Sequence, residues 1–308
     1  MGLYKIDKAN KLSNISIKDF STRFDNEKPL QEFTEKNLEI LFGLEFISTE
    51  FKLENFRLDT LAFDVENNSF VIIEYKKIEN FSLMDQGMTY LNLALDHKDS
   101  LLLEYLEKNE KHLKRTDIDW NLTRVVFIGP EFTVYQKRAL TPDLQFELWE
   151  VKIYEDNIIS YSQVIPVQRS IESKVKKVLS GRAAKEIETY TIEQHYKKAS
   201  KQTVELLDEL RDRIKQIDTE IIEKPVGDYI GFKISWYNFV SVHVYKDKLK
   251  VYVRKEKFQN DTNNQLTKVP PSYKWGKTPL WWVDVKSDKT IDYLIPIIKE
   301  SYDFAPDK

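Results

Sequence analysis

Two neighbouring β-type segments constrain this chain most, because both place charged residues among apolar ones. Residues 57–65 and 70–76 are rich in β-branched, aromatic and aliphatic residues, which favours strands. The four polar residues 66–69 between them favour a turn. Since so short a connection predicts an antiparallel hairpin, we expect a sheet at this point of the fold.

The charged residues of this hairpin fall on faces that are otherwise apolar. Side chains alternate between the two faces of a strand, so Asp59 shares a face with three apolar residues of its segment. By the same rule, Glu74 and Lys76 share a face with Phe70 and Ile72. Burying a poorly compensated charge costs on the order of several kcal/mol. A metal ion together with a charged substrate could supply the compensation.

The residue types suit hydrolysis of a phosphodiester. Asp59 and Glu74 offer hard oxygen ligands for Mg²⁺ or Mn²⁺, and the backbone carbonyl of Tyr75 is a candidate third ligand. A divalent cation polarises the phosphate and lowers the pKa of the attacking water. Lys76 is expected to orient that water or to stabilise developing negative charge. The alternative interpretation is an ordinary charge pair on a half-exposed hairpin.

Helical and strand patterns surround the hairpin. Pro29 suits the first turn of a helix and Gly43 its C-terminal stop. The expected order is a helix at 29–42, the hairpin, a helix at 83–97, a strand at 122–128, a helix at 133–140 and a strand at 145–153. The final strand–helix–strand unit favours a right-handed crossover onto the same sheet. We therefore predict an α/β sandwich, with a mixed sheet flanked by helices.

A second domain is expected after this sandwich. The predicted boundaries are 1–166 for the first domain, 167–190 for a basic linker with some helix, and 191–308 for a smaller α+β domain. The second domain is expected to contain a helix at 191–217, strands at 229–235, 239–245, 249–254 and 281–285, a polar loop at 257–279 and a helix at 290–302.

A basic and aromatic segment lies in this second domain. Between residues 241 and 280 there are nine Lys or Arg against three acidic residues, with aromatic residues interleaved. Basic groups neutralise phosphates, and aromatic rings can stack on unpaired bases. The candidate nucleic-acid-binding residues are Arg57 and Lys77 near the hairpin, and Lys248, Lys250, Arg254, Lys255, Lys274 and Trp275 in the second domain. A solvated strand face with core aromatics is the alternative.

Composition removes several classes of function. The chain has no Cys, which excludes disulfides, a thiol nucleophile and Cys-ligated zinc or iron–sulfur sites. Its net charge is −3, so affinity for nucleic acid must come from a local basic surface. The polar N-terminus lacks the apolar core of a signal peptide, and no stretch approaches the roughly 18 apolar residues that span a bilayer. We expect a cytoplasmic protein without a membrane segment.

Four segments in a fixed order resemble a known superfamily. They are 30–39, 57–61, 71–77 and 86–91, and they include Asp59 followed after 14 residues by Glu74-Tyr75-Lys76. The pattern resembles the PD-(D/E)XK nucleases, and more closely the NucS-like nuclease domain. It is closer still to uncharacterised bacterial and archaeal proteins that join such a domain to a C-terminal domain of unknown function. Leu58 replaces the proline of the superfamily's name, at a position that varies among its members.

The resemblance implies two further site residues. In this superfamily a Glu on the first helix and a Gln on the helix after the hairpin complete the site. Gln86 matches the second, one helical turn from Tyr90. For the first we choose Glu35, because helical phase places it nearer the edge of the apolar face than Glu32 or Glu39.

The resemblance implies a metal-dependent endonuclease with a restriction-endonuclease-like fold and with Mg²⁺ or Mn²⁺ as cofactor. DNA is the expected substrate and partner, and a homodimer is left open. A catalytically silent nuclease fold that binds nucleic acid or protein is the alternative. The resemblance covers most of the chain and is least informative after Pro166.

Overall fold

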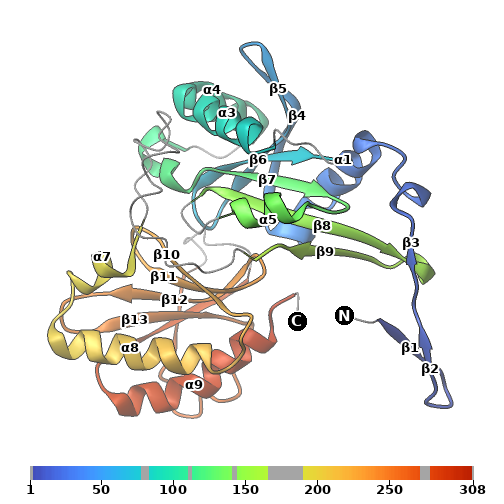
Figure 1. Ribbon diagram of the computed structural model, residues 1–308. Coiled ribbons are helices and arrows are strands. Elements are labelled where there is room, and N and C mark those ends of the chain that lie inside the picture. The colour runs from blue at the N-terminus through green and yellow to red at the C-terminus, as the bar shows by residue number, and fades with distance from the viewer. Residues whose placement is uncertain are drawn as a thin grey trace. The chain divides into compact units, whose positions relative to one another are not determined.

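The computed structural model describes residues 3–77, 83–109, 113–140, 144–165, 190–270 and 278–306. The chain divides into two compact units, Met1–Glu188 and Thr189–Lys308 (Figure 1). The predicted linker at 167–190 lies outside the described residues except for Tyr190.

The first unit is built on a mixed sheet that has seven strands within its described residues, in the order β3-β8-β7-β6-β5-β4, with β9 paired to β8. These strands are β3 (Ile17–Lys18), β4 (Glu45–Leu53), β5 (Phe56–Asp64), β6 (Ser69–Tyr75), β7 (Arg124–Gly129), β8 (Phe146–Tyr154) and β9 (Ile159–Gln163). The hairpin β5–β6 is antiparallel, as predicted, and β6, β7 and β8 are parallel. A separate hairpin pairs β1 (Tyr4–Ile6) with β2 (Leu12–Asn14).

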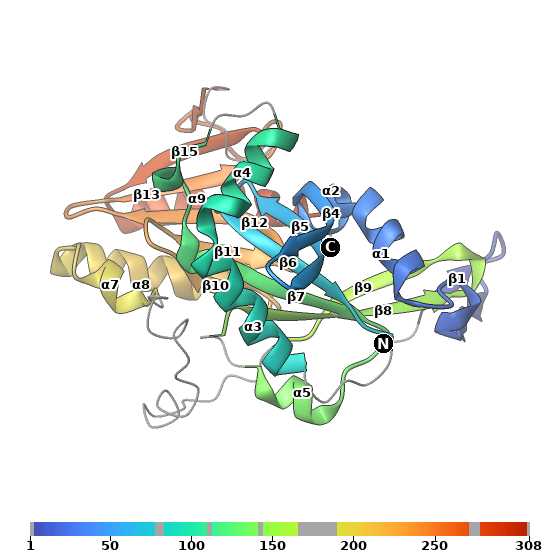
Figure 2. The same cartoon turned by 90° about the horizontal axis from the view of Figure 1, so that it is seen from above.

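Helices cover both faces of this sheet. They are α1 (Glu27–Lys36), α2 (Leu38–Phe42), α3 (Leu83–Asp96), α4 (Lys98–Lys108) and α5 (Val134–Ala139), with short 3₁₀ helices η1 (Phe20–Thr22), η2 (Arg115–Asp117), η3 (Trp120–Leu122) and η4 (Glu155–Asn157). Leu83 and Leu91 of α3 pack in one core cluster with Phe70 and Ile72 of β6. Figure 2 shows α1 and α2 on the other side of β5–β7 from α3 and α4. The mixed sheet flanked by helices agrees with the predicted sandwich.

One predicted helix of this unit needs correction, and several of its elements were not predicted. The helix expected at 29–42 is two helices. Asn37 leaves the helical conformation (φ −119°, ψ 12°), and its side-chain Nδ2 donates to the Phe33 carbonyl. Gly43 ends α2 at φ 65°, as expected. The strands β4 and β9 and the helix α4 were not predicted; all three are partly exposed and bury few residues fully.

The second unit is an antiparallel sheet in the order β10-β11-β12-β13-β15-β14. Its strands are β10 (Ile222–Pro225), β11 (Ile230–Ile234), β12 (Tyr237–Val244), β13 (Leu249–Arg254), β14 (Thr267–Lys268) and β15 (Leu280–Val285); its helices are α7 (Ile192–Tyr196), α8 (Lys201–Lys215) and α9 (Asp288–Asp303). Helices α8 and α9 pack on one face of the sheet (Figure 1). The helix expected at 191–217 is two helices, because Ser200 starts a new one by accepting the Thr203 amide.

Candidate active site

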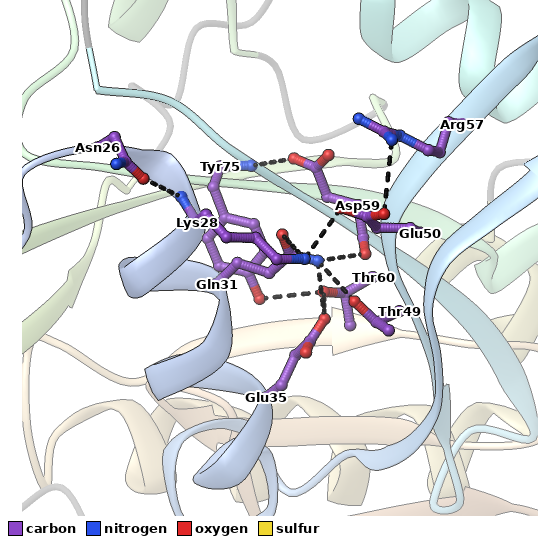
Figure 3. Close-up of polar contacts among 10 residues, drawn as sticks. All are labelled: Asn26, Lys28, Gln31, Glu35, Thr49, Glu50, Arg57, Asp59, Thr60 and Tyr75. Carbon is purple, nitrogen blue, oxygen red and sulfur yellow. Dashed lines mark hydrogen bonds and ion pairs between the residues drawn. The ribbon is translucent and has the colours of Figure 1, made fainter.

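The carboxylate of Asp59 lies where the β5–β6 ladder stops. The last backbone pair of that ladder joins Thr60 to Ile73. Beyond it, the Tyr75 amide donates to Asp59 Oδ2 at 3.1 Å (Figure 3). The side chain thus accepts an N–H that the neighbouring strand backbone does not take, and this bond holds the carboxylate beside the end of β6.

Glu74 provides the second carboxylate, on the face of the sheet that carries α3. The residue is only 4% exposed. Its Oε1 accepts from Lys76 Nζ at 2.9 Å and from Gln86 Nε2 at 2.6 Å. Its Oε2 is buried and has no hydrogen-bond partner among the described residues. A buried acceptor left unsatisfied costs about 1–3 kcal/mol, and more when it is charged.

The pKa values of the two carboxyl groups are both raised. Burial and, after it, the negative charge of Asp59 raise the pKa of Glu74 to about 7, against the opposing effects of Lys76 and Gln86. Burial also raises the pKa of Asp59, which the Tyr75 amide and the Lys76 charge oppose. Two acids in this relation resist carrying two negative charges at once unless a cation joins them.

Close packing brings Gln86 to Glu74. Gln86 lies on α3, and its Nε2 also donates to the Tyr90 hydroxyl at 2.8 Å. The next residue is Gly87, where a Cβ would lie 3.0–3.1 Å from the rings of Phe146 and Phe127. Glycine therefore lets α3 approach the sheet closely enough for the Gln86 side chain to reach the buried Glu74 carboxylate.

A second glycine, Gly129, allows the backbone of Lys76 to lie close to β7. The Lys76 amide donates to the Ile128 carbonyl at 2.8 Å, which continues the pairing of β6 with β7. A Cβ on Gly129 would lie 2.5 Å from the Lys76 carbonyl oxygen. Because that oxygen belongs to the backbone and cannot rotate away, this position requires glycine.

Glu35 does not join the Asp59–Glu74 pair, contrary to the prediction. Its Oε1 accepts from Thr60 Oγ1 at 2.6 Å and from Gln31 Nε2 at 2.9 Å (Figure 3). Since Thr60 and Asp59 are successive residues of a strand, their side chains point to opposite faces. Helical phase correctly predicted that Glu35 points toward the sheet. Glu35 contacts the sheet face that α1 covers, whereas Asp59 and Glu74 lie on the opposite face.

Gln31 links Glu35 to the Asp59 backbone. Its side chain is buried, and Nε2 lies 2.6 Å from the Asp59 carbonyl oxygen and 2.9 Å from Thr49 Oγ1 (Figure 3). Glu35 therefore helps hold the strand that carries Asp59 from behind.

Glu27 is an acid of α1 that lies near the pair and was not predicted. Its Oε1 accepts from the Lys77 amide at 3.0 Å. Its negative charge is among the smaller influences that raise the pKa of Asp59, after burial. A signal was present in the sequence: Asn26 caps the helix by accepting the Lys28 amide, and an acid in the first turn is typical. Because the predicted helix began at Pro29, Glu27 was not assigned to it.

The donor set of the pair suits a hard divalent cation. Carboxylate oxygens are its preferred ligands, and Glu74 Oε2 is a buried oxygen that such an ion would satisfy. Within the described ranges no group of three or more Asp, Glu, His or Cys is arranged to hold a metal. Mg²⁺ is usually bound by one or two carboxylates and completes its shell with water and substrate phosphate, so two suffice. Coordination by the Tyr75 carbonyl stays a prediction.

The two predicted nucleic-acid contacts near this site reach the surface, and each one contacts an oxygen of the protein. The Arg57 guanidinium is 3.4 Å from Glu50 Oε2, with 59% of its side chain exposed. The Lys77 ammonium donates to the Asp25 carbonyl. Both cations are on the surface and could exchange these partners for a phosphate.

The predicted contacts of the second unit separate into different environments. Lys248 pairs with Asp284 at 2.7 Å, Lys255 pairs with Glu300 at 2.8 Å, and Lys250 Nζ lies 3.9 Å from the centroid of the Trp282 ring. Arg254 is a correction: it is 4% exposed, so its charge is not available to a polyanion. Lys274 and Trp275 lie outside the described residues.

Fold and site together define a mixed α/β protein with a buried two-carboxylate centre, completed by a lysine and a glutamine. An uncharacterised protein from Haemophilus influenzae (strain ATCC 51907 / DSM 11121 / KW20 / Rd) is 34% identical over 286 residues, which are 91% of this chain and 93% of that protein. The chain belongs to the family of this protein. The model of a domain of unknown function, DUF5655, matches residues 192–305. This match confirms the predicted C-terminal domain of unknown function.

Two solved structures are similar to parts of the chain. A repair endonuclease from Pyrococcus abyssi is 18% identical, with a TM-score of 0.29 over 43% of this chain and 49% of that chain. EndoMS in a complex with double-stranded DNA is 14% identical, with a TM-score of 0.30 over 48% of this chain and 65% of that chain. The chain thus spans about half of the first protein and two thirds of the second.

None of the helices in the described part of the chain is both long and apolar enough to cross a lipid bilayer.

Proposed function

We propose that this protein is a metal-dependent endonuclease of the PD-(D/E)XK type, NucS-like in its first unit, which hydrolyses phosphodiester bonds in DNA. The observation that carries the proposal is the environment of Glu74. This carboxylate is 4% exposed, lies close enough to Asp59 for that charge to raise its pKa, and keeps one oxygen without a hydrogen bond in the described structure. A purely structural ion pair between Glu74 and Lys76 would not need Asp59 as a second acid beside it. DNA as the substrate rests on the resemblance of the four sequence segments.

Each side chain has a role in this proposal. Asp59 and Glu74 would hold Mg²⁺ or Mn²⁺, and such a cation, when bound, polarises the phosphate and acidifies a water. The Lys76 ammonium, 2.9 Å from Glu74 Oε1, supplies positive charge for the developing phosphorane. Gln86 fixes the orientation of Glu74 from α3. Arg57, exposed at the start of β5, would contact a neighbouring phosphate.

The alternative is a catalytically silent nuclease fold that binds nucleic acid or protein. The observation in its favour is that no group of three acidic or imidazole side chains converges in the described residues. Such a scaffold gains no stability from Mg²⁺, whereas a protein that binds the ion gains about 2.7 kcal/mol at a concentration of 100 Kd.

Cleavage of DNA tests the proposal. The wild-type chain should nick plasmid DNA or cut branched DNA with Mg²⁺ or Mn²⁺ and not with EDTA. Asp59→Ala removes an expected metal ligand and Lys76→Ala the charge beside it, so we expect each to lower the rate at least about 100-fold. Glu32→Ala is the matched control, because Glu32 is an exposed acid of α1. Activity unchanged in both site variants contradicts the proposal.

A further inference from the structure

The sheet of the second unit has two faces of opposite character. On one face Val242, Val251 and Val283 lie side by side on β12, β13 and β15 and pack into the core with α8 and α9. On the other face the strand register brings Ser241, Tyr252 and Trp282 into one row. The next row on that face consists of His243, Lys250 and Asp284. The second face is thus polar and aromatic where the first is aliphatic.

Rings form a continuous strip across this second face. The ring centroids of Tyr229 and His243 are 5.4 Å apart, and those of His243 and Tyr252 are 5.0 Å apart. Trp282 lies directly across from Tyr252, and Lys250 Nζ is 3.9 Å from the centroid of its ring. All five side chains are half-buried. His243 is the most enclosed of them, since its Nε2 atom is buried.

Lysines border the strip. The pairing of β10, β11 and β12 places Lys224 and Lys233 on the same face, and Lys248 and Lys250 follow on β13 and the turn before it. The acids nearby are Asp284, which pairs with Lys248 at 2.7 Å, and Asp228 beside the His243 ring. Cations outnumber acids on this face although the whole chain carries a net charge of −3. We call the strip and its lysines the aromatic–lysine face.

We propose that the aromatic–lysine face binds single-stranded nucleic acid, with bases stacked on Tyr252 and Trp282 and phosphates held by Lys250 and its neighbouring lysines. Partly exposed flat rings on a sheet offer a surface to bases that are not already stacked in a duplex, and lysines complement the backbone charge. An acidic protein partner would be matched by the lysines but would leave the ring strip unexplained. The inference does not depend on hydrolysis at Asp59 and Glu74.

Binding to labelled oligonucleotides tests the proposal. The full chain is titrated in EDTA, so that the proposed metal-dependent cleavage cannot consume the probe, against fluorescent oligo-dU, oligo-U and a duplex of equal length. We expect both single strands to bind more tightly than the duplex, and the ratio of dU to U affinity identifies the preferred sugar, because the two probes carry the same base. Trp282→Ala should weaken single-strand binding about tenfold, the effect of losing one stacked base. Trp282→Phe should retain most of the affinity because it keeps a ring.

Charge variants give an independent readout. Lys250→Gln should weaken binding and lower the slope of log affinity against log salt by about 0.7, the value for one phosphate contact on a single strand. Lys201→Gln is the matched control, since Lys201 is exposed on α8 on the opposite face. The melting temperature of every variant is measured alongside. The proposal is overturned if the duplex binds as tightly as the single strands, or if Lys250→Gln behaves like Lys201→Gln. It is also overturned if folded Trp282→Ala binds like the wild type.

Discussion

At the scale of single residues, local patterns identified the side chains whose position depends on one element. Strand alternation predicted the common environment of Asp59, Glu74 and Lys76, and the family resemblance suggested Gln86, which the structure places against Glu74. Glu27 could not be chosen this way, because its position depends on where α1 begins and on which end of it approaches β6. These are properties of the assembled sheet and helix, which periodicity within one segment does not contain.

The burial of Glu74 makes stability depend on pH in a definite direction. Its pKa is about 7 in the folded protein against an ordinary value of 4.5. A carboxyl with a raised pKa binds its proton more tightly when folded, so its contribution is complete below pH 4.5 and is lost as pH rises to about 7. We expect the metal-free protein to lose on the order of 3 kcal/mol of unfolding free energy from this group across that window.

Urea unfolding between pH 4.5 and 8 in EDTA measures this loss. Glu74→Gln cannot titrate at this position, so its stability should fall less with pH than that of the wild type. Glu32→Gln, an exposed acid, should follow the wild-type curve. Parallel curves for wild type and Glu74→Gln would mean that Glu74 titrates normally.

At the scale of elements, the strongly patterned segments were predicted and the weakly patterned ones were not. The β5–β6 hairpin is buried along most of its length, so composition alone indicated two strands. In contrast, β4 and α4 expose much of their surface and bury few residues fully. Two helices were expected to be longer than they are, because the breaks at Asn37 and before Ser200 are made by side-chain caps rather than by Gly or Pro.

The contact between β6 and β7 predicts a sensitive glycine. Gly129→Ala places a Cβ 2.5 Å from the Lys76 carbonyl oxygen, so one strand must move. We expect a loss of about 1–3 kcal/mol in unfolding free energy, together with impaired cleavage because Lys76 shifts. Gly227→Ala is the comparison, since the atoms nearest to its Cβ would belong to the Tyr190 side chain, at 3.2–3.3 Å, and a side chain can give way. Equal effects of the two variants in urea unfolding would argue against a special constraint at Gly129.

At the scale of the whole molecule, the sequence predicted two domains from a change in composition, and the structure divides into units at Glu188 and Thr189. The 286 residues shared with the Haemophilus influenzae relative exceed the length of either unit, so both units occur together in the family. Lys248 and Lys250 of the aromatic–lysine face were predicted as nucleic-acid contacts. The row of rings was not, because its rings come from separate strands that only the sheet register aligns. The two proposals together, cleavage by the first unit and single-strand binding by the second, predict a preference for DNA that is partly unpaired.

The central claim is that Asp59 and Glu74 together hold a divalent cation. Calorimetric titration of the full chain with Mn²⁺ at pH 8, above the raised pKa of Glu74, measures this directly. We predict saturable binding to the wild type and to Glu32→Gln, and loss of that binding in the double variant Asp59→Asn with Glu74→Gln, whose fold is verified by its melting curve. Undiminished Mn²⁺ binding by the folded double variant, or no binding by the wild type, would contradict the claim.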